Sequence, residues 1–285
     1  MRHTPLPRER LILHPSERRK AVEEVIDSAR ARLVLSIYRL DDADVLAALM
    51  RARRRGVTVE VLVTRRVKGA KAALNVLVAA LEAAGFGVKR YTALPKYHAK
   101  YIVADGRVAF VGSLNFTQKC FDYTCDFAVL TRDPDVARGL AHLFDVDYHG
   151  KNGDGDFGSR LIVGPDAARR RYGELLGRAQ RHIRLIDHKL TDIDMLNVIR
   201  DRVRAGVSVD ILGREDLATL CAHGKLMIVD SQVAAIGSIA LSPRSLDRRR
   251  ELAIVLRDRG TIGVLQDYFD GFKPAGRQRA SALAG

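Results

Sequence analysis

Residues 97–116, YHAKYIVADGRVAFVGSLNF, decide both the fold and the chemistry expected of this chain. A histidine and a lysine stand two residues apart, directly before an apolar run typical of a β-strand. In an extended strand, side chains two residues apart point to the same face. The imidazole of His98 and the ammonium group of Lys100 are therefore expected to converge on one site.

The same pattern occurs a second time in residues 222–238, AHGKLMIVDSQVAAIGS. Each copy has a histidine, a lysine, an aspartate, a glycine and a serine at identical spacing, which are His98, Lys100, Asp105, Gly112 and Ser113 in the first copy and His223, Lys225, Asp230, Gly237 and Ser238 in the second. The copies differ two residues later, where Asn115 corresponds to Ala240. Packing alone rarely produces two such copies, so the pattern indicates a functional site.

The two copies belong to an internal duplication of the whole chain. RLILHP at 10–15 aligns with RLIVGP at 160–165, an offset of 150 residues that holds as far as Gly56 and Gly206. The offset between the two histidines is only 125, so the first half carries 25 additional residues between Thr64 and Tyr97. Most of these, including AKAALNVLVAALEAAG at 70–85, have a helical pattern.

Each half alternates helical segments with short apolar runs, which predicts an α/β fold in which helices cover a mixed sheet. We expect a first lobe at residues 1–149 and a second at 160–272. The Gly- and Asp-rich residues 150–159 are the expected linker, and residues 273–285 an expected loose tail.

Composition restricts the class of protein but not its substrate. The 285 residues are 47% hydrophobic, and the longest uncharged apolar run, Ala72 to Leu81, is too short to cross a bilayer. We expect a cytoplasmic, monomeric protein without a transmembrane segment. Its formal charge of +14 favours anionic partners such as nucleic acid, anionic lipid or phosphorylated small molecules. Cys120, Cys125 and Cys221 are expected to be reduced thiols.

The repeated residues suit chemistry on a phosphate group. A neutral imidazole is a good nucleophile towards phosphorus, and a neighbouring ammonium group stabilises the developing negative charge. Asp126 and Glu251 each follow a motif histidine by 28 residues, and a carboxylate that accepts the second ring N–H fixes the tautomer. Three further side chains are candidate donors to phosphate oxygens, namely Ser113, Asn115 and Ser238. Asp105 and Asp230 are expected to be structural acceptors.

The pattern HxKx4Dx6GSxN, present twice with an acidic residue after each copy, resembles the phospholipase D superfamily. The resemblance implies two homologous α/β/α lobes related by a pseudo-two-fold axis, with one active site at their interface. It also implies that His98 attacks the phosphodiester and that His223 acts first as acid and then as base. A covalent phosphohistidine is formed, and no metal or other cofactor is required. Ala240 departs from the pattern and makes the expected phosphate grip asymmetric.

Other roles for these residues fit the sequence less well. A metal site at Cys221, His223 and Cys120 or Cys125 is disfavoured, because the ammonium group of Lys225 would stand beside the cation. The histidines at 142, 149, 182 and 188 are expected to have ordinary surface or core roles. Arg51 to Arg55 and Arg248 to Arg250 are expected mainly as solvated faces. The second stretch directly precedes Glu251 and so lies near the site, which makes it the better candidate to bind a substrate's outer phosphates.

Three functions remain open. The favoured one is hydrolysis or transphosphatidylation of a phospholipid, with peripheral contact between the basic surface and an anionic membrane. The alternative is a nuclease that cuts a nucleic-acid phosphodiester. A non-catalytic module that binds polyanions is the third, and it would need a broken motif.

Overall fold

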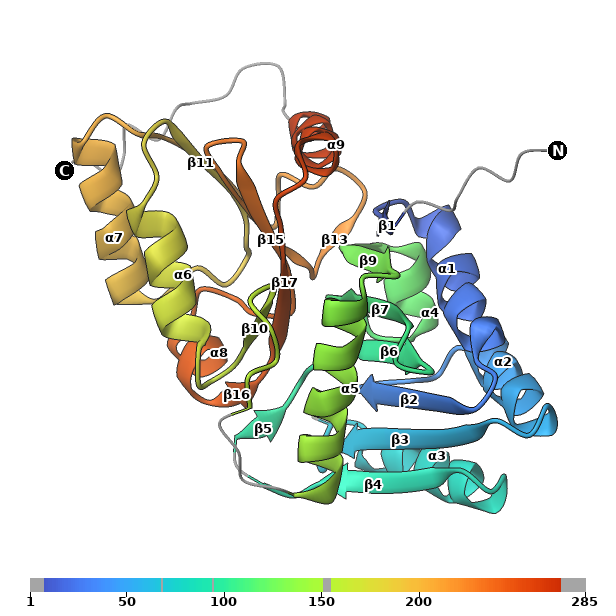
Figure 1. The fold of residues 1–285 in the computed structure, drawn as a ribbon. Helices are drawn as coiled ribbons and strands as arrows, with labels where there is room; N and C mark the ends of the chain where they lie inside the picture. Colours follow the sequence, from blue (N-terminus) through green and yellow to red (C-terminus); the bar gives the residue numbers. More distant parts are fainter. Residues whose placement is uncertain (1–7, 68, 94, 151–154, 273–285) are drawn as a thin grey trace, which may run out of the picture.

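The computed structural model describes residues 8–67, 69–93, 95–150 and 155–272. The first lobe occupies the right of Figure 1. Its elements in chain order are β1 (Glu9–Ile12), α1 (Pro15–Ser28), β2 (Arg32–Ile37), α2 (Ala43–Arg54), β3 (Thr58–Thr64), α3 (Lys71–Ala83), β4 (Gly87–Tyr91), β5 (Lys96–Tyr97), β6 (Tyr101–Ala104), β7 (Val108–Gly112), α4 (Gln118–Asp122), β8 (Thr124–Cys125), β9 (Ala128–Thr131) and α5 (Pro134–His149).

The second lobe repeats this order without counterparts of α3 and β4, which are the additional residues of the first half. Its elements are β10 (Leu161–Val163), α6 (Ala168–Gly177), β11 (His182–Ile186), α7 (Ile193–Arg204), β12 (Ser208–Leu212), β13 (Cys221–Ala222), β14 (Lys225–Val229), β15 (Val233–Gly237), α8 (Pro243–Asp247), β16 (Arg249–Arg250), β17 (Leu252–Leu256) and α9 (Arg259–Asp270). Part of the expected linker, 151–154, and the expected tail lie outside the described residues.

Each lobe is built on one mixed sheet, as the alternation of helices and apolar runs predicts. The strand orders are β1-β9-β7-β6-β2-β3-β4 in the first lobe and β10-β17-β15-β14-β11-β12 in the second. In each sheet β2 or β11 pairs in parallel with the strand after it and antiparallel with the motif strand, β6 or β14. This pairing places the start of each motif strand beside the carboxyl end of β2 or β11.

Local interactions repeat between the lobes as well. Asp42 caps the N-terminus of α2 by accepting from the Val45 amide, and Asp192 caps α7 in the same way. Arg19 binds the first cap and Arg169 the second, at 2.8 and 2.6 Å. A buried aspartate that caps a helix and is paired with a guanidinium group holds α2 against α1, and α7 against α6.

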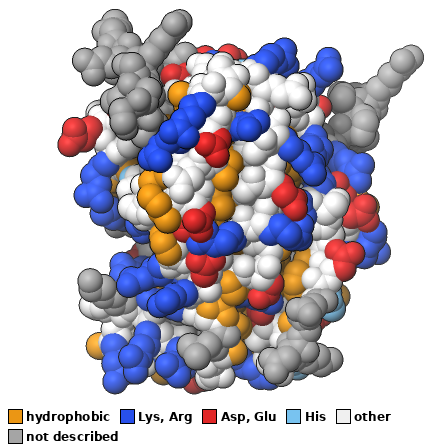
Figure 2. Space-filling model, turned by 90° about the vertical axis from the view of Figure 1, so that its left-hand side faces the viewer, with side chains coloured by type: hydrophobic (Ala, Val, Ile, Leu, Met, Phe, Trp, Pro, Cys, Tyr) orange, Lys and Arg blue, Asp and Glu red, His pale blue; other side chains and the backbone are white. Residues whose placement is uncertain are grey.

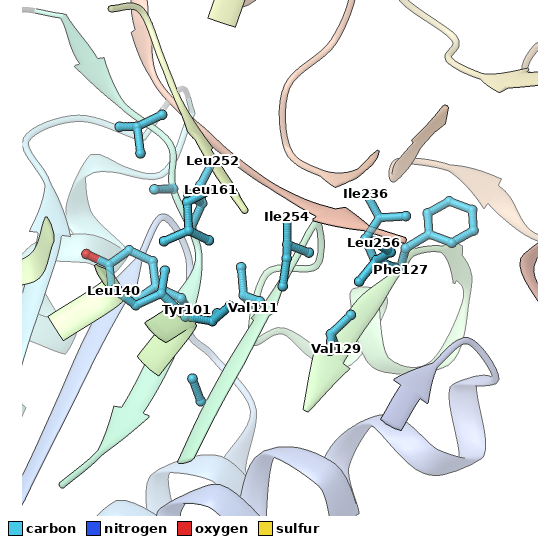
Figure 3. Close-up of a cluster of buried hydrophobic side chains, with 14 of the residues drawn as sticks. Tyr101, Val111, Phe127, Val129, Leu140, Leu161, Ile236, Leu252, Ile254 and Leu256 are labelled. Atoms are coloured by element: carbon cyan, nitrogen blue, oxygen red, sulfur yellow. The ribbon is translucent and has the colours of Figure 1, made fainter. Parts of the chain in front are cut away.

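The two sheets pack face to face across one continuous apolar core (Figure 3). Val111 and Val129 of the first sheet lie in the same cluster as Ile236 and Ile254 of the second. Apolar side chains of α5 and α9 complete this cluster. The outer faces have separate cores, formed with α1 to α4 in the first lobe and with α6 to α8 in the second. The shared core fixes the lobes relative to each other and gives the expected α/β/α layers.

Two short parallel strand pairs join the lobes at the edge of this core. β5 pairs with β16, and β13 pairs with β8. The amide of His98 donates to the carbonyl of Arg250 at 2.8 Å, and the amide of Gly224 donates to that of Cys125 at 2.7 Å. Each motif histidine therefore lies beside the chain of the opposite lobe, just before the acidic residue of that lobe.

Asp105 and Asp230 lie at the far ends of their motif strands, away from the histidines. Both have left-handed backbone, with φ of 53° and 55°. The carboxylate of Asp105 accepts from the amides of residues 30–32, and that of Asp230 from the amides of residues 180–182. Each aspartate thus ties the turn after its motif strand to the start of β2 or β11.

Candidate active site

The first half of the site is centred on His98. Its Nδ1 lies 3.1 Å from Oε1 of Glu251, which belongs to the other lobe. Glu251 is 1% exposed and also receives hydrogen bonds from Ser245 at 2.6 Å and Arg249 at 3.3 Å. Because Nδ1 faces the carboxylate, the proton of a neutral imidazole is held there and Nε2 keeps its lone pair.

The second half of the site is centred on His223. Its Nδ1 lies 2.8 Å from Oδ1 of Asp126, a completely buried carboxylate of the first lobe. Hydroxyl groups of Ser113 and Thr124 also donate to this carboxylate. The imidazole of His223 itself is 26% exposed, so its Nε2 edge is accessible to substrate.

The carboxylates are exchanged between the lobes. Asp126 follows His98 by 28 residues but supports His223, and Glu251 supports His98 although it follows His223. The cross-lobe pairing of β5 with β16 and of β13 with β8 causes this exchange. Neither half of the site is therefore complete within one lobe.

The two lysines lie beneath the histidines and are almost completely buried, with exposures of 1% for Lys100 and 8% for Lys225. Each ammonium group donates to the carbonyl of its own motif histidine, and that of Lys100 lies 3.1 Å from Nδ1 of His98. Burial lowers the pKa of Lys100 to about 7, and the charge of Lys225 adds to this shift. The two cations are held close enough to repel each other, an arrangement that an anionic phosphate would relieve.

Electrostatics also set the protonation state of the first pair. Burial lowers the pKa of His98 to about 3, and Lys100 contributes in the same direction. Burial alone would raise the pKa of Glu251, but His98, Ser245 and Lys100 outweigh it and lower that pKa to about 2. At neutral pH the pair is a neutral imidazole beside an ionised carboxylate, which is the form a nucleophile requires.

Ser113 and Ser238, two of the three expected phosphate donors, form hydrogen bonds within the protein. The hydroxyl of Ser113 donates to Asp126, and that of Ser238 lies 3.4 Å from the carbonyl of Leu252. Both also accept a backbone amide, from Phe127 and Leu252 respectively. These hydroxyls therefore connect the motif turn to the neighbouring strand, because the adjacent glycines allow a close approach there. In this structure both hydroxyl groups donate to acceptors within the protein.

Asn115 lies next to the opposite histidine. Its Nδ2 is 3.4 Å from Nε2 of His223 and 3.8 Å from Sγ of Cys120, and its Oδ1 has no partner among the described residues. The sequence places this amide in the first half of the site, where it was expected to tighten the grip of the His98 side. The structure instead adds it to the His223 side, because the loop after β7 reaches across the interface.

Comparisons with known proteins agree with this geometry. Residues 22–148 and 187–273 match the family model described as "Cardiolipin synthase, PLD-like domain". The chain belongs to this family. The resemblance to the phospholipase D superfamily is therefore confirmed, and the chain is an enzyme of the phosphodiesterase and phosphatidyltransferase type.

Curated relatives of this cardiolipin synthase-like chain include cardiolipin synthase B of Salmonella typhi. The two sequences are 26% identical over 88% of this chain and 76% of the relative. Cardiolipin synthase B of Escherichia coli K12 is 23% identical over 91% of this chain and 78% of its own length. Both matches extend through the two lobes.

Solved structures show the same fold. Phosphatidylserine synthase from Haemophilus influenzae superposes with a TM-score of 0.75 at 11% identity, covering 93% of this chain and 86% of that protein. Polyphosphate kinase from Porphyromonas gingivalis gives 0.78 at 18% identity, covering 92% of this chain and 46% of the kinase. The expected two-lobed α/β fold is thus confirmed.

Two aromatic residues beside the site of this cardiolipin synthase-like chain were not predicted. The ring of Tyr38 lies 4.6 Å from the ring of His98, and Lys100 Nζ lies 5.5 Å from its centroid. His188 stands at the equivalent position in the second lobe, and its buried Nδ1 has no partner among the described residues. Burial, with Lys225 adding, lowers its pKa to about 3. The offset of 150 aligns these two positions and could have indicated them.

Among the described residues, one group of side chains could ligate a metal, and it differs from the metal site considered in the sequence by including Asp126. A sulfur of Cys120, a carboxylate oxygen of Asp126 and a ring nitrogen of His223 lie within 4.8 Å of one another. Both oxygens of Asp126 already accept hydrogen bonds, and burial raises the pKa of the Cys120 thiol. Cys120 therefore does not provide a thiolate, and Asp126 does not provide a free carboxylate oxygen. The group suits acid and base chemistry better than metal binding.

Proposed function

We propose that this chain transfers the phosphatidyl group of a phospholipid to an alcohol through a covalent phosphohistidine on His98. The observation that carries the proposal is the exchange of carboxylates. It leaves two histidines of opposite lobes with Nδ1 held and Nε2 available, above two buried ammonium groups. Such a pair can attack a phosphorus atom from one side and protonate a leaving oxygen on the other.

The reaction proceeds in two steps. Nε2 of His98 attacks phosphorus, the bond from phosphorus to the leaving alcohol breaks, and His223 gives a proton from Nε2 to that oxygen. An acceptor hydroxyl then attacks phosphorus and loses its proton to His223, and the bond between phosphorus and His98 breaks. Lys100 and Lys225 stabilise the charge on the phosphoryl oxygens in both steps. Water as the acceptor gives hydrolysis.

A phospholipid is favoured as the substrate over nucleic acid. The matching family and its curated relatives carry the name of cardiolipin synthase, an activity on phospholipid. Figure 2 shows numerous lysine and arginine side chains on the face seen there, which suits peripheral contact with an anionic membrane. Among the described residues, none of the helices is long and apolar enough to span a bilayer. Catalytic roles for the two histidines, monomeric state and cytoplasmic location are part of this proposal.

The test uses a chromogenic phosphodiester labelled with ³²P, in excess chelator, followed by rapid quenching. We expect wild-type protein to give acid-labile labelled protein, and His98→Asn to give none. His223→Asn should form the label, because a good leaving group needs no acid, and should release it slowly. Labelling retained in His98→Asn, or activity abolished by the chelator, would contradict the proposal.

The substrate is tested by comparing turnover of phospholipid vesicles with glycerol as acceptor against cleavage of single- and double-stranded DNA, both over a salt series. We expect lipid turnover and formation of a new phospholipid. Rapid DNA cleavage without lipid turnover would support the nuclease alternative instead.

A further inference from the structure

Helix α1 carries a buried cation that the proposed mechanism does not use. The buried face of this helix consists of five residues, which are Arg18, Ala21, Val22, Val25 and Ile26. Arg18 is the only charged member, and its side chain is 0% exposed, whereas long basic side chains usually bring the charged group to the surface. It also lies near the N-terminus of α1, where the helix dipole disfavours a cation.

Arg18 forms no ion pair with a described carboxylate. Its guanidinium group donates instead to main-chain carbonyl oxygens, at 2.6 Å to Cys120, 3.0 Å to Leu13, 3.4 Å to Asp126 and 3.5 Å to Phe121. Its buried Nε has no partner among the described residues. Burial of a cation without a counter-ion is costly, and departures from ordinary folding preferences are expected at functional sites. A role in the neighbouring site is therefore indicated.

The carbonyl groups that Arg18 binds include both ends of one short segment. Cys120 belongs to α4, which lies beside α1 (Figure 1), and Asp126 follows β8 directly. Asp126 is the residue whose carboxylate lies 2.8 Å from Nδ1 of His223. The guanidinium group therefore holds the main chain on both sides of β8, including that of the residue that supports His223.

The position of Arg18 also affects the hydroxyl group of Thr124. This hydroxyl lies 3.1 Å from the carbonyl oxygen of Cys120 and also within hydrogen-bonding distance of Oδ2 of Asp126. Because a hydroxyl has one proton, it can donate to only one of these acceptors at a time. Arg18 already supplies a charge-assisted donor to the Cys120 carbonyl, so the proton of Thr124 is left for the carboxylate.

The second lobe supports its carboxylate in a different way. The offset of 150 residues aligns Arg18 with Ala168, which is also 0% exposed, so the second lobe has no cation at this position of its helix. The guanidinium group of Arg249 lies instead 3.3 Å from the carboxylate of Glu251 itself. An arginine thus binds the side chain of Glu251 in one half of the site and the main chain of Asp126 in the other.

We infer that Arg18 is a positioning residue, which holds Asp126 in the orientation that supports His223. The inference rests on the proposed role of His223 as acid and then base. Arg18 acts on this half of the site alone, because none of its contacts with described residues involves Glu251 or His98.

The first experiment compares leaving groups for Arg18→Met. We expect kcat to fall about 10²-fold with an alkyl leaving group, because a misplaced His223 delivers its proton poorly. Formation of the phosphohistidine from a nitrophenyl ester needs no acid and should be unchanged, whereas its breakdown, which needs His223 as base, should be slow. An equal loss of phosphohistidine formation with both leaving groups would show general damage to the site and overturn the inference.

The matched control is Ile26→Ala, because Ile26 is a 0% exposed residue of the same helix that packs in the outer core of the first lobe. We expect this variant to unfold at lower urea concentration and to keep the wild-type rates. Arg18→Lys guards against loss of folding, since it keeps the charge but lacks the planar fork. It should show a smaller loss than Arg18→Met, again confined to the alkyl leaving group. If Ile26→Ala lost as much activity as Arg18→Met, loosening of α1 alone would be responsible and the inference would fail.

The second experiment does not depend on turnover, so it separates this inference from the proposed function. With ¹⁵N-labelled histidine, NMR shows which ring nitrogen carries the proton, and signals are assigned with His98→Asn and His223→Asn. Wild type and Ile26→Ala should have the Nδ1–H tautomer at both histidines. The two Arg18 variants should keep it at His98, which serves as the internal reference, and show a mixture of tautomers at His223. A His223 signal unchanged in both Arg18 variants would refute the positioning role even if phosphatidyl transfer is observed.

Discussion

The two halves of the site have the same motif but differ in what surrounds the supporting carboxylate. Glu251, which holds His98, receives hydrogen bonds from Ser245 and from the guanidinium group of Arg249. Asp126, which holds His223, accepts hydrogen bonds from the hydroxyl groups of Ser113 and Thr124. None of the described arginines binds its carboxylate. A guanidinium group thus lies beside the first carboxylate, whereas the second carboxylate is held by hydroxyl groups.

This difference suggests how one duplicated motif provides both a nucleophile and an acid. A nucleophilic imidazole must be neutral before attack, whereas an acid must carry a proton on Nε2. Burial, Lys100 and Arg249 all lower the pKa of His98 and so favour the first state there. After an amide flip, Oδ1 of Asn115 would take the place of Nδ2 beside His223 and could accept a hydrogen bond from a protonated Nε2. In the proposed mechanism, the duplicated motif provides the geometry and the neighbouring side chains distinguish the two histidines.

Replacing each supporting carboxylate by its amide should have the largest effect on the reaction rate. We expect Asp126→Asn to reduce kcat by about 10³ to 10⁴ with an alkyl leaving group, since the amide can hold the wrong tautomer of the histidine. The loss should be much smaller with a nitrophenyl leaving group, which needs no acid. Glu251→Gln should lower the rate with both, because it disturbs the nucleophile.

The measurement is the dependence of rate on the pKa of the leaving alcohol for both variants. The roles of the two histidines would be reversed if Glu251→Gln showed the steep dependence and Asp126→Asn the flat one. Circular dichroism and a urea unfolding curve for each variant would exclude a loss caused by unfolding.

Much of this arrangement could be predicted from the sequence, because a duplicated motif shows the chemistry and the offsets show the extra residues of the first lobe. The exchange of carboxylates between the lobes could not be predicted. Each carboxylate follows a histidine by 28 residues, and this spacing does not show whether it binds that histidine or the one in the other lobe. The exchange depends on β5 and β13 pairing with strands of the opposite lobe, and two-residue strands such as KY and CA carry no pattern. For the same reason, the tertiary partners of Ser113 and Asn115 were not foreseen.

The residue between histidine and lysine provides a second comparison. Gly224 stands where the first lobe has Ala99, and a methyl group there would lie 2.7 Å from Oγ of Ser113 and 2.9 Å from Cα of Asp126. We expect Gly224→Ala to displace His223 from its carboxylate and to lower kcat by about 10²-fold. Ala99→Gly, the matched change in the other lobe, should cost only about 1 kcal/mol of stability. Kinetics and urea unfolding of both variants test this, and an unaffected Gly224→Ala enzyme would contradict the geometry.

The buried Lys100 should make both the activity and the stability of the protein depend on pH. Because burial lowers the pKa of Lys100 to about 7, the free enzyme should lose about tenfold in kcat/KM for each pH unit above that value. The folded state binds fewer protons than the unfolded state between pH 7 and 10.5, so the contribution of this group to the free energy of unfolding should rise with pH in that window. Lys100→Met should abolish activity and remove this rise.

The measurements are a pH profile of kcat/KM and thermal unfolding at several pH values. Lys20→Met, a change at an exposed position of α1, serves as the control for a lost surface charge. An alkaline limb that persists only above pH 9, or a pH dependence of unfolding unchanged in Lys100→Met, would contradict the role given to burial.

The smallest expected effect concerns the one position at which the motif copies differ. Asn115→Ala should lower kcat about threefold to tenfold, because it removes a single polar contact to His223 at 3.4 Å. Ala240→Asn should not create the equivalent contact, since Ala240 is 2% exposed and its amide is held by Ser245, the residue that also supports Glu251. Crowding there should instead destabilise the fold by about 1–3 kcal/mol. The opposite result would be a higher activity in Ala240→Asn and an unchanged activity in Asn115→Ala. An amide would then assist catalysis on the His98 side, and the difference between the two halves would not lie in the contact of Asn115 with His223.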